Sequence, residues 1–433
     1  MGLYNANNHQ LLLPYTKLLA SHVNQACHEQ ALSLFHHIHT TLSLILDPFV
    51  FPLALKCCAA LRRPRLGTTI HAYTTKAFHN NAFIACALVD MYGKCVSVSS
   101  ARNLFDEIPQ RNVVVWNSMI SLYCKHNDVS AARGLFESMN VAPNPSSFNC
   151  ILAALCESSG AENGGCYEAI GFYRGMQVLG VRPNLITVLA LLPVCVGVVA
   201  LNLIKELHGY SIRNNIGWSR PHLSSGLVEA YGRCGCLGNA RRIFDRMSEK
   251  DVVAWSSMVS VYALHGEVET ALSLFQQMEL ARVRPDAITF LGVLKACSHA
   301  GLADEAQMYF RKMQSYYKVK ASSDHYACLV DVLSRAGRLY EAYKVLREMP
   351  VKATAKAWGA LLAACRSYGE MELAEVAGRV LFEIEPNNAG NYVLLASIYS
   401  AAGRFKEAER VRTEMKDRGV KSLPGSSWVI DHD

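Results

Sequence analysis

The chain has 433 residues, of which 51% are hydrophobic and 18% are charged, and its 43 Lys and Arg exceed its 36 Asp and Glu to give a net charge of +7. This composition can bury a large core, which excludes the disordered and collagen-like classes. The small positive excess allows a polyanionic partner such as a nucleic acid but does not require one. The 15 Cys are spread through apolar helical patterns without a secretory signal before them, so we expect reduced thiols in core positions.

An apolar stripe with the period of an α-helix recurs along nearly the whole chain. Each copy is an Ala followed by an apolar pair at +3 and +4 and an apolar residue at +7, which together form one helical face. The copies begin at Ala31, Ala101, Ala132, Ala169, Ala240, Ala271, Ala306 and Ala342, with a weaker copy at Ala408. Each of the three wide gaps has room for one degenerate copy, so the mean spacing is about 34 residues.

A second stripe precedes the first by about fifteen residues in each copy. It is clear at Trp116, Met119, Ile120 and Tyr123, and again at Trp255, Met258, Val259 and Tyr262. A turn residue such as Gly266 separates the two stripes, and a proline such as Pro285 ends several of the units. The pattern predicts helical hairpins that stack into an all-α solenoid with a long concave surface, because one hairpin cannot bury its apolar face alone.

The segment 183–204 carries no charge and is long enough to cross a membrane. Pro193 and Gly197 interrupt its apolar run, and the segment falls in register with the repeat. We therefore predict a buried helix pair rather than a membrane span.

Three runs of sequence resemble the plant pentatricopeptide repeat family, in its PLS subfamily of alternating longer and shorter units. They are NAFIACALVDMYGKCVSVSSARNLFDEIPQRN, NVVVWNSMISLYCKHNDVSAARGLFESM and DVVAWSSMVSVYALHGEVETALSLFQQMELARVRPDAITF. The resemblance implies a right-handed superhelix with units at 12–47, 48–81, 82–112, 113–144, 145–184, 185–220, 221–251, 252–286, 287–322 and 323–354. A tetratricopeptide array is the alternative fold, although its Trp/Gly/Tyr spacing is absent.

The two ends of the array differ from the repeats. Residues 1–11 form a short N-terminal segment, and residues 355–433 contain AWGALLAACRSYGEMELAE and NNAGNYVLLASIYSAAGRFKEAERVRTEMKDRGVKSLPGSSWVI. Both runs of residues 355–433 resemble the E-type extension of the family. Related editing proteins continue into a DYW deaminase domain, and the stop at Asp433 leads us to expect that this domain is missing.

The resemblance also implies that the fifth and last residues of each unit face one base of single-stranded RNA. Unpaired RNA exposes its Watson–Crick edge, which short polar side chains can read. By this rule Thr16 with Asp47, Ser225 with Asp251 and Ser256 with Asp286 resemble guanine readers, whereas Asn117 with Asn144 and Asn149 with Asn184 resemble pyrimidine readers. The rule gives no base for Pro52 with Asn81, Cys86 with Asn112, Leu189 with Arg220, or Leu291 with Ser322.

Each of these residues has a simpler interpretation as well. A Ser or Asn before a helix, and an Asp or Asn after a proline, are common caps and turn residues. The second-position residues Val114, Val253 and Ile288 can flank the bases, as in the family, or belong to the core. The sequence leaves these alternatives open.

We expect no catalytic residue, metal site or cofactor. A zinc deaminase needs an HxE motif and a downstream CxxC pair. The single HxE, His265-Gly266-Glu267, falls in a turn between helices, and no CxxC exists. The Gly-rich stretch 160–165 lacks a phosphate-loop pattern, and His36, His37 and His39 are typical of a solvated helix face.

The sequence therefore predicts a recognition subunit for C-to-U editing of organellar transcripts, with residues 355–431 recruiting a deaminase-bearing protein in trans. RNA stabilisation or processing without editing is one alternative, and a protein-interaction scaffold of the tetratricopeptide type is another. We expect a mitochondrial location, with the plastid as alternative, although the first eleven residues lack the Arg and Ser of a transit peptide.

Overall fold

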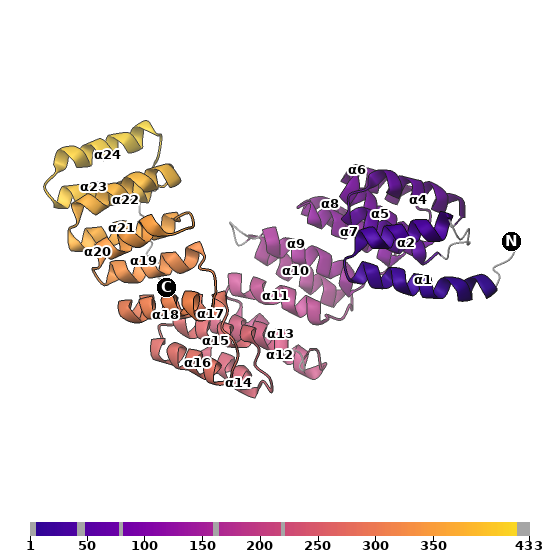
Figure 1. Ribbon diagram of the computed structural model, residues 1–433, viewed down its shortest axis with the longest axis horizontal. Coiled ribbons are helices and arrows are strands. Elements are labelled where there is room, and N and C mark those ends of the chain that lie inside the picture. Colours follow the sequence, from indigo (N-terminus) through magenta and orange to yellow (C-terminus); the bar gives the residue numbers. More distant parts are fainter. Residues whose placement is uncertain (1–5, 41–47, 78–80, 159–163, 218–220, 422–433) are drawn as a thin grey trace, which may run out of the picture. The chain divides into compact units, whose positions relative to one another are not determined.

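The computed structural model describes residues 6–40, 48–77, 81–158, 164–217 and 221–421, and in these residues it contains only helices and their connections. The first twelve helices are α1 (Ala6–Asn24), α2 (His28–Thr40), α3 (Val50–Ala60), α4 (Pro64–Ala77), α5 (Ala82–Cys95), α6 (Val98–Glu107), α7 (Val113–Lys125), α8 (Val129–Glu137), α9 (Pro145–Ser158), α10 (Gly164–Val178), α11 (Leu185–Gly197) and α12 (Leu201–Arg213). The second twelve are α13 (Pro221–Arg233), α14 (Leu237–Arg246), α15 (Val252–Leu264), α16 (Val268–Leu280), α17 (Ala287–Ala300), α18 (Ala303–Ser315), α19 (Ser323–Arg335), α20 (Leu339–Glu348), α21 (Ala355–Tyr368), α22 (Met371–Ile384), α23 (Ala389–Ala401) and α24 (Phe405–Asp417). Figure 1 shows the hairpins that these helices form.

The chain forms two compact units. The first comprises Met1–Leu203 and Gly209–Ile216, and the second comprises Ile204–His208 and Gly217–Asp433. Within each unit every odd-numbered helix packs on the next odd-numbered helix, from α1 to α11 in the first and from α13 to α23 in the second. The even-numbered helices other than α12 pack on the first helix of their own hairpin and, except for α24, on the first helix of the next one. Each unit is therefore a two-layered stack of hairpins, which confirms the predicted all-α solenoid.

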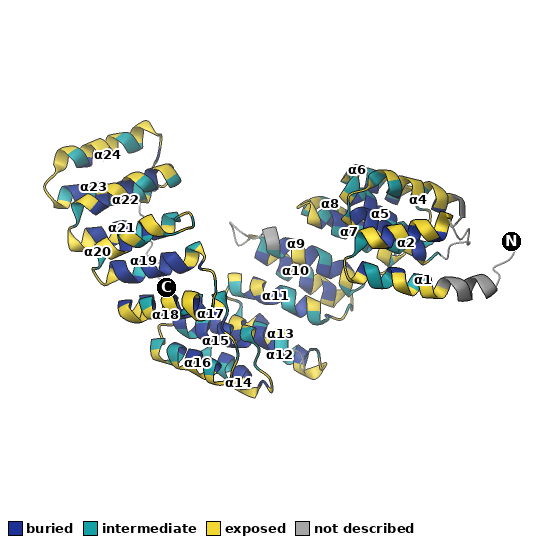
Figure 2. Cartoon of the chain, in the orientation of Figure 1, coloured by how far each residue is buried: buried dark blue, intermediate teal, exposed yellow. Residues whose placement is uncertain are grey.

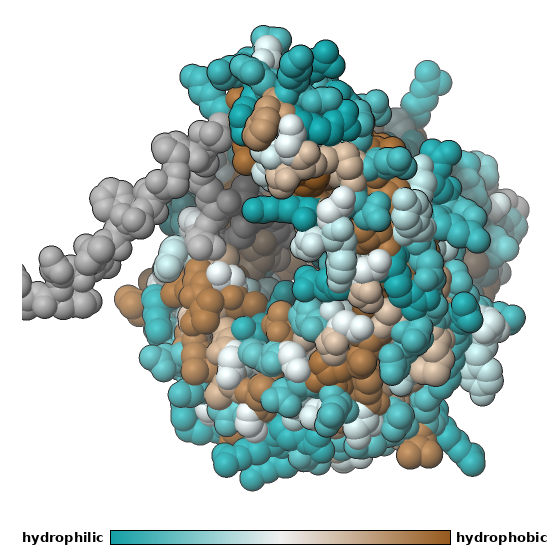
Figure 3. Space-filling model, turned by 90° about the vertical axis from the view of Figure 1, so that its left-hand side faces the viewer, coloured by the Kyte–Doolittle hydropathy of each residue, from teal (hydrophilic) through white to brown (hydrophobic). Residues whose placement is uncertain are grey.

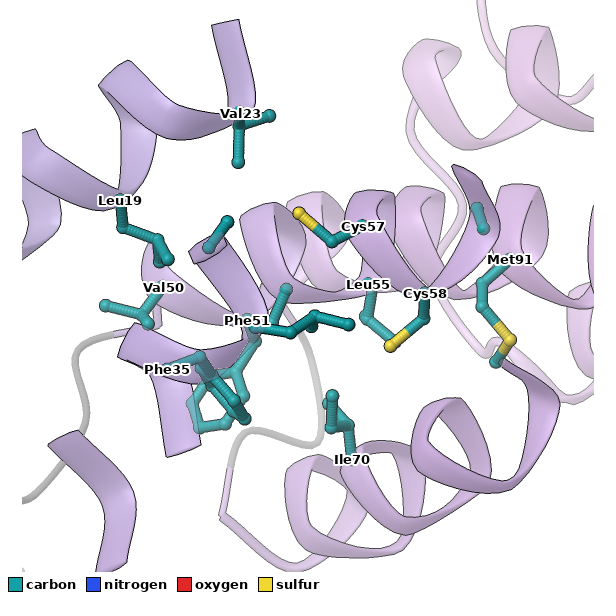
Figure 4. Close-up of a cluster of buried hydrophobic side chains, with 14 of the residues drawn as sticks. Leu19, Val23, Phe35, Val50, Phe51, Leu55, Cys57, Cys58, Ile70 and Met91 are labelled. Atoms are coloured by element: carbon teal, nitrogen blue, oxygen red, sulfur yellow. The ribbon is translucent and has the colours of Figure 1, made fainter. Parts of the chain in front are cut away.

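The predicted stripes form the core of both units. All nine alanines that begin the first stripe are at most 1% exposed. Figure 2 shows the buried residues along the sides of helices that face their neighbours. In the first unit, Leu19, Phe35, Phe51, Leu55 and Ile70 from four successive helices form one cluster (Figure 4).

Helix starts agree with the expected repeat boundaries. Eight helices, α5, α7, α9, α11, α13, α15, α17 and α19, each begin at the first residue of an expected unit, and α21 begins at the first residue of the expected extension. Side-chain caps explain several of these starts: Asn112, Asn184 and Asp286 accept backbone N–H bonds at the beginning of α7, α11 and α17. Helix α1 differs, since it begins at Ala6 rather than residue 12.

The uncharged segment forms α11 and the first residues of α12, with Pro193 inside α11. Val188, Leu191 and Leu192 of α11 are buried, as expected for a core helix. No helix of the described residues is long and apolar enough to cross a membrane. Burial also raises the pKa of the Cys58 and Cys297 thiols to about 12, in keeping with cysteines in core positions.

Candidate nucleic-acid interface

One groove of about 710 Å³ runs along the second unit and is lined only by the first helices of five consecutive hairpins. Helices α13, α15, α17, α19 and α21 all contribute to it. The second-position residues Ile288 and Lys356 and the fifth-position residues Leu291 and Ala327 lie among its lining residues. Both positions face the groove at α17, where Ile288 and Leu291 line it, whereas the fifth-position residues Ser225 of α13 and Ser256 of α15 are not among its lining residues.

The second-position residues lie at the surface. Val114, Val253 and Ile288 are exposed, at 48%, 46% and 61%, so they do not belong to the core. The equivalent residues of four other hairpins are also apolar and exposed: Leu13, Phe49, Phe83 and Ile186. Sequence reasoning missed these four, although their constant position after the unit boundary could have identified them. The same position thus carries an exposed apolar side chain in each of seven hairpins. Such a side chain is suited to stacking against flat, partly apolar groups such as bases.

Two of the predicted pairs meet directly. The Asn117 Nδ2 donates to the Asn144 Oδ1 at 3.1 Å, and the Asn149 Nδ2 donates to the Asn184 Oδ1 at 3.1 Å. In each pair the fifth residue belongs to the first helix of a hairpin, and the last residue caps the first helix of the next hairpin. The two residues that the sequence assigned to one base thus form one polar contact in the structure.

Capping fixes the orientation of the last residue in each pair. The Asn144 Oδ1 accepts the backbone N–H of Ser147 at 3.1 Å, and the Asn184 Oδ1 accepts that of Thr187 at 3.0 Å. Because the oxygen is used by the cap, the amide nitrogen of each asparagine remains as a donor for another group.

Aspartate at the same position leaves a hydrogen-bond acceptor, where asparagine leaves a donor. The Asp251 Oδ1 accepts the backbone N–H of Ala254 at 2.9 Å, and the Asp286 Oδ1 accepts that of Thr289 at 2.8 Å. The second carboxylate oxygen of each remains as an acceptor. The helix-cap interpretation and the base-reading interpretation are therefore compatible, since one atom caps the helix and the other is left for a ligand.

The serines differ from the asparagines. Ser225 and Ser256 are buried, at 2% and 3% exposure. The Ser256 hydroxyl donates to the Val253 carbonyl at 3.1 Å, whereas the Ser225 hydroxyl has no hydrogen-bond partner in the structure. The Asn117 Oδ1 is also buried and unpartnered. Two of the proposed readers thus carry an unsatisfied polar atom, which is an uncommon and unfavourable state for a buried group.

The remaining predicted positions are less informative. Thr16 is half-buried in α1, and its proposed partner Asp47 lies outside the described residues. Asn81 and Asn112 each accept two backbone N–H groups at a helix start, as ordinary caps do. These two belong to hairpins for which the sequence gave no base.

Comparison with known proteins decides the family. A putative pentatricopeptide repeat-containing protein of Arabidopsis thaliana is 58% identical over 423 residues, which cover 98% of this chain and 97% of that protein. The chain belongs to the pentatricopeptide repeat family. The chloroplastic Arabidopsis pentatricopeptide repeat-containing protein CRR2 is 37% identical over 390 residues, and this chain spans 54% of its length.

Family models agree with this membership, and a solved structure has a similar fold. The PPR repeat family model matches residues 111–157 and 250–299, the PPR repeat model matches 225–252, 288–316 and 324–352, and the E motif model matches 368–430. The crystal structure of the pentatricopeptide repeat protein PPR10 in complex with an 18-nt psaJ RNA element aligns with a TM-score of 0.72. The identity is 18%, and the alignment covers 95% of this chain and 61% of PPR10, so this likeness concerns the fold.

The HxE sequence of this pentatricopeptide repeat chain has a structural role. His265 ends α15, and its Nε2–H donates to the Gly232 carbonyl at 2.6 Å. This bond links the C-terminal end of α15 to the Gly232 carbonyl near the end of α13, which also accepts the backbone N–H of Gly235 at 3.0 Å. Within the described ranges no group of three or more His, Cys, Asp or Glu side chains is placed to hold a metal. His36, His37 and His39 are exposed on α2.

The surface is mixed in polarity. Hydrophilic side chains cover much of the face shown in Figure 3, and hydrophobic ones gather in patches between them. The charges in the groove of the second unit are mainly paired within a helix, as Glu229 is with Arg233 at 3.3 Å and Asp331 with Arg335 at 3.1 Å.

Proposed function

We propose that the chain binds single-stranded RNA along the first helices of its hairpins, with one base per hairpin, and directs C-to-U editing of an organellar transcript. The observation that carries RNA reading is the polar contact between the fifth and last residues of one hairpin, next to an exposed apolar second residue. Asn117 with Asn144 beside Val114 is the clearest example. PPR10, whose fold is similar, is described in complex with an RNA element, which supports the same class of ligand.

The geometry supports the proposed base preferences. A free amide N–H at Asn144 and Asn184 can donate to the carbonyl oxygen of a pyrimidine, and the free oxygen of Asp251 and Asp286 can accept from the N–H groups of guanine. The assignments are thus pyrimidine for the Asn pairs and guanine for the Ser–Asp pairs. The same rule assigns guanine to Thr16 with Asp47.

The E motif supports the editing role. We propose that residues 355–431 recruit a deaminase-bearing protein in trans and that the chain supplies recognition without a cofactor. We propose the mitochondrion as the site of action, with the plastid as the alternative. Loss of the protein should then remove C-to-U conversion at one or a few sites when the organellar transcripts are sequenced. Altered transcript ends or abundance, with all C-to-U conversions intact, would instead support RNA processing or stabilisation.

Base reading can be tested at Ser256. The Ser256→Asn substitution should move the preferred base opposite this hairpin from guanine toward a pyrimidine and weaken binding to the original RNA by about 1–3 kcal/mol. Binding would be measured with four RNAs that differ only at that base. An unchanged preference for guanine in the variant would contradict the assignment of Ser256 as a base reader. RNA binding that does not fall steeply with salt would favour a protein-interaction scaffold.

A further inference from the structure

The groove of the second unit extends beyond its base-reading hairpins. After Asp286 the fifth positions hold Leu291, Ala327 and Gly359, none of which can hydrogen-bond a base through its side chain. The second position also changes, from the apolar Ile288 to Asp324 and Lys356. The groove nevertheless continues along α17, α19 and α21.

Two lysines are the uncompensated charges of this part of the groove. Lys295 on α17 and Lys356 on α21 are both exposed and line it. The carboxylates in the groove are already engaged, Glu229 by Arg233 and Asp331 by Arg335. Neither lysine takes part in an ion pair in the part of the chain that the structure describes.

The two lysines belong to the helices on either side of α19. Helix α19 packs between α17 and α21, and its Cys328 lines the groove between the two lysines. Burial raises the pKa of the Cys328 thiol to about 11, and both Lys295 and Lys356 act against that rise. Both positive charges therefore act on the same thiol in the groove. The groove is also lined by small residues such as Ala327 and Ala360.

We propose that Lys295 and Lys356 bind phosphodiester groups of the RNA strand where it passes beyond the base-reading hairpins, and so anchor the strand without reading its sequence. This inference rests on the proposed RNA binding. A lysine ammonium is a compact point charge that binds phosphate without the fixed fork geometry of arginine. Since neither lysine must be freed from a carboxylate, both charges are available to the strand. Small groove residues let the backbone approach.

The test measures RNA affinity of the full chain as a function of salt. The variants are Lys295→Ala, Lys356→Ala and the double substitution, and Lys344→Ala on α20 is the control, because its ammonium lies 3.9 Å from Glu348 outside the groove. For single strands the slope of log affinity against log salt is about −0.7 per neutralised phosphate. Each groove lysine should contribute about 0.7 units to the total slope. This contribution corresponds to about a 2.5-fold change in RNA affinity between 50 and 200 mM salt. The Lys344→Ala slope should equal that of the wild type.

Three further readouts complete the test. The base preference at the Ser256 hairpin should be unchanged in the lysine variants, and Lys295→Arg with Lys356→Arg should keep the wild-type slope. RNA lengthened by a few nucleotides on one side of the read segment should bind the wild type more tightly, and the gain should disappear in the double alanine variant.

The outcomes separate this inference from the proposed function. A wild-type chain that binds RNA with base preference, together with alanine variants of wild-type slope, would overturn the lysine anchor alone. A wild-type chain without salt-dependent RNA binding would overturn both. Tighter or weaker binding of an acidic protein segment by the same variants, with RNA binding unchanged, would also overturn the anchor and assign the lysines to a protein partner.

Discussion

The two Asn–Asn pairs differ by one hydrogen bond. The Asn149 Oδ1 accepts from the Thr187 hydroxyl at 2.7 Å, whereas the Asn117 Oδ1 has no partner. Asn149 is thus built into the cap of α11 through two of its polar groups. Asn117 keeps one acceptor that only a ligand or water can satisfy.

This difference predicts unequal effects of alanine substitution. Asn149→Ala removes one hydrogen bond from Thr187 and one from Asn184 and should lower the free energy of unfolding by about 1–2 kcal/mol. Asn117→Ala removes an atom that was already unsatisfied and should lower it by less. Both substitutions should weaken RNA binding. Urea unfolding and RNA titration of the two variants would check this, and equal losses of stability would contradict the distinct role of Asn117.

Two histidines make stability depend on pH. His71 and His208 are half-buried, and their Nδ1 atoms lie 2.9 and 3.1 Å from the hydroxyls of Tyr92 and Tyr231. Burial lowers the pKa of both histidines, with Glu107 acting in the opposite direction at His71. The folded chain therefore binds these protons less readily than the unfolded chain. The stability that the neutral form provides is present above the ordinary histidine pKa of about 6.5 and is lost as the pH falls below it.

We therefore expect the urea midpoint to decrease between about pH 7.5 and pH 5.5, and to decrease less when both residues are replaced in His71→Gln with His208→Gln. The matched control replaces the exposed His36 and His37 of α2 with Gln. A wild-type pH dependence in the His71 and His208 variant would show that other groups cause the decrease.

At the scale of the element, glycine sets how closely neighbouring first helices approach. A Cβ added to Gly232 of α13 would lie 2.3 Å from a methyl group of Val261 on α15. Gly93 of α5 meets Leu122 of α7 in the same way, at 2.4 Å. Each glycine is the twelfth residue of its helix, so a hairpin of each compact unit uses glycine for the same kind of contact.

Gly232→Ala should therefore destabilise the second unit by about 1–3 kcal/mol through overpacking. The control is Gly238→Ala on α14, where an added Cβ has nothing within 4 Å and the effect should be neutral or slightly stabilising. Adding Val261→Ala to Gly232→Ala should recover part of the loss in a thermal melt. A Gly232→Ala protein as stable as the Gly238→Ala protein would contradict the close contact.

The sequence predicted the elements better than it predicted the site. Local signals such as the alanine stripe and the caps at Asn184 and Asp286 fix where helices begin, and the structure agrees at eight unit starts and at the start of the extension. The start of α1 at Ala6 carries no such stripe. The burial of Ser225 and Ser256 could not be read from a local pattern either, because it depends on how closely the neighbouring helices cover a small side chain.

At the scale of the whole molecule, the two compact units carry different predicted readers. The first unit contains both Asn–Asn pairs, Asn117 with Asn144 and Asn149 with Asn184, and the second contains both Ser–Asp pairs. The two sets of readers have no residue in common. Sites that share no side chains contribute independently to free energy.

We therefore predict that the target RNA has one pyrimidine doublet and one guanine doublet that contribute additively to binding. Changing either doublet should weaken binding by about 1–3 kcal/mol per base, and changing both should give the sum of the two losses. The measurement is a cycle of four RNAs titrated against the same protein. The cycle is then repeated with the Asn117→Ala variant. This substitution should reduce the effect of the pyrimidine doublet and leave the effect of the guanine doublet unchanged. A guanine effect that disappears with the pyrimidine doublet would show that the two units bind the strand as one site, and independent recognition would be wrong.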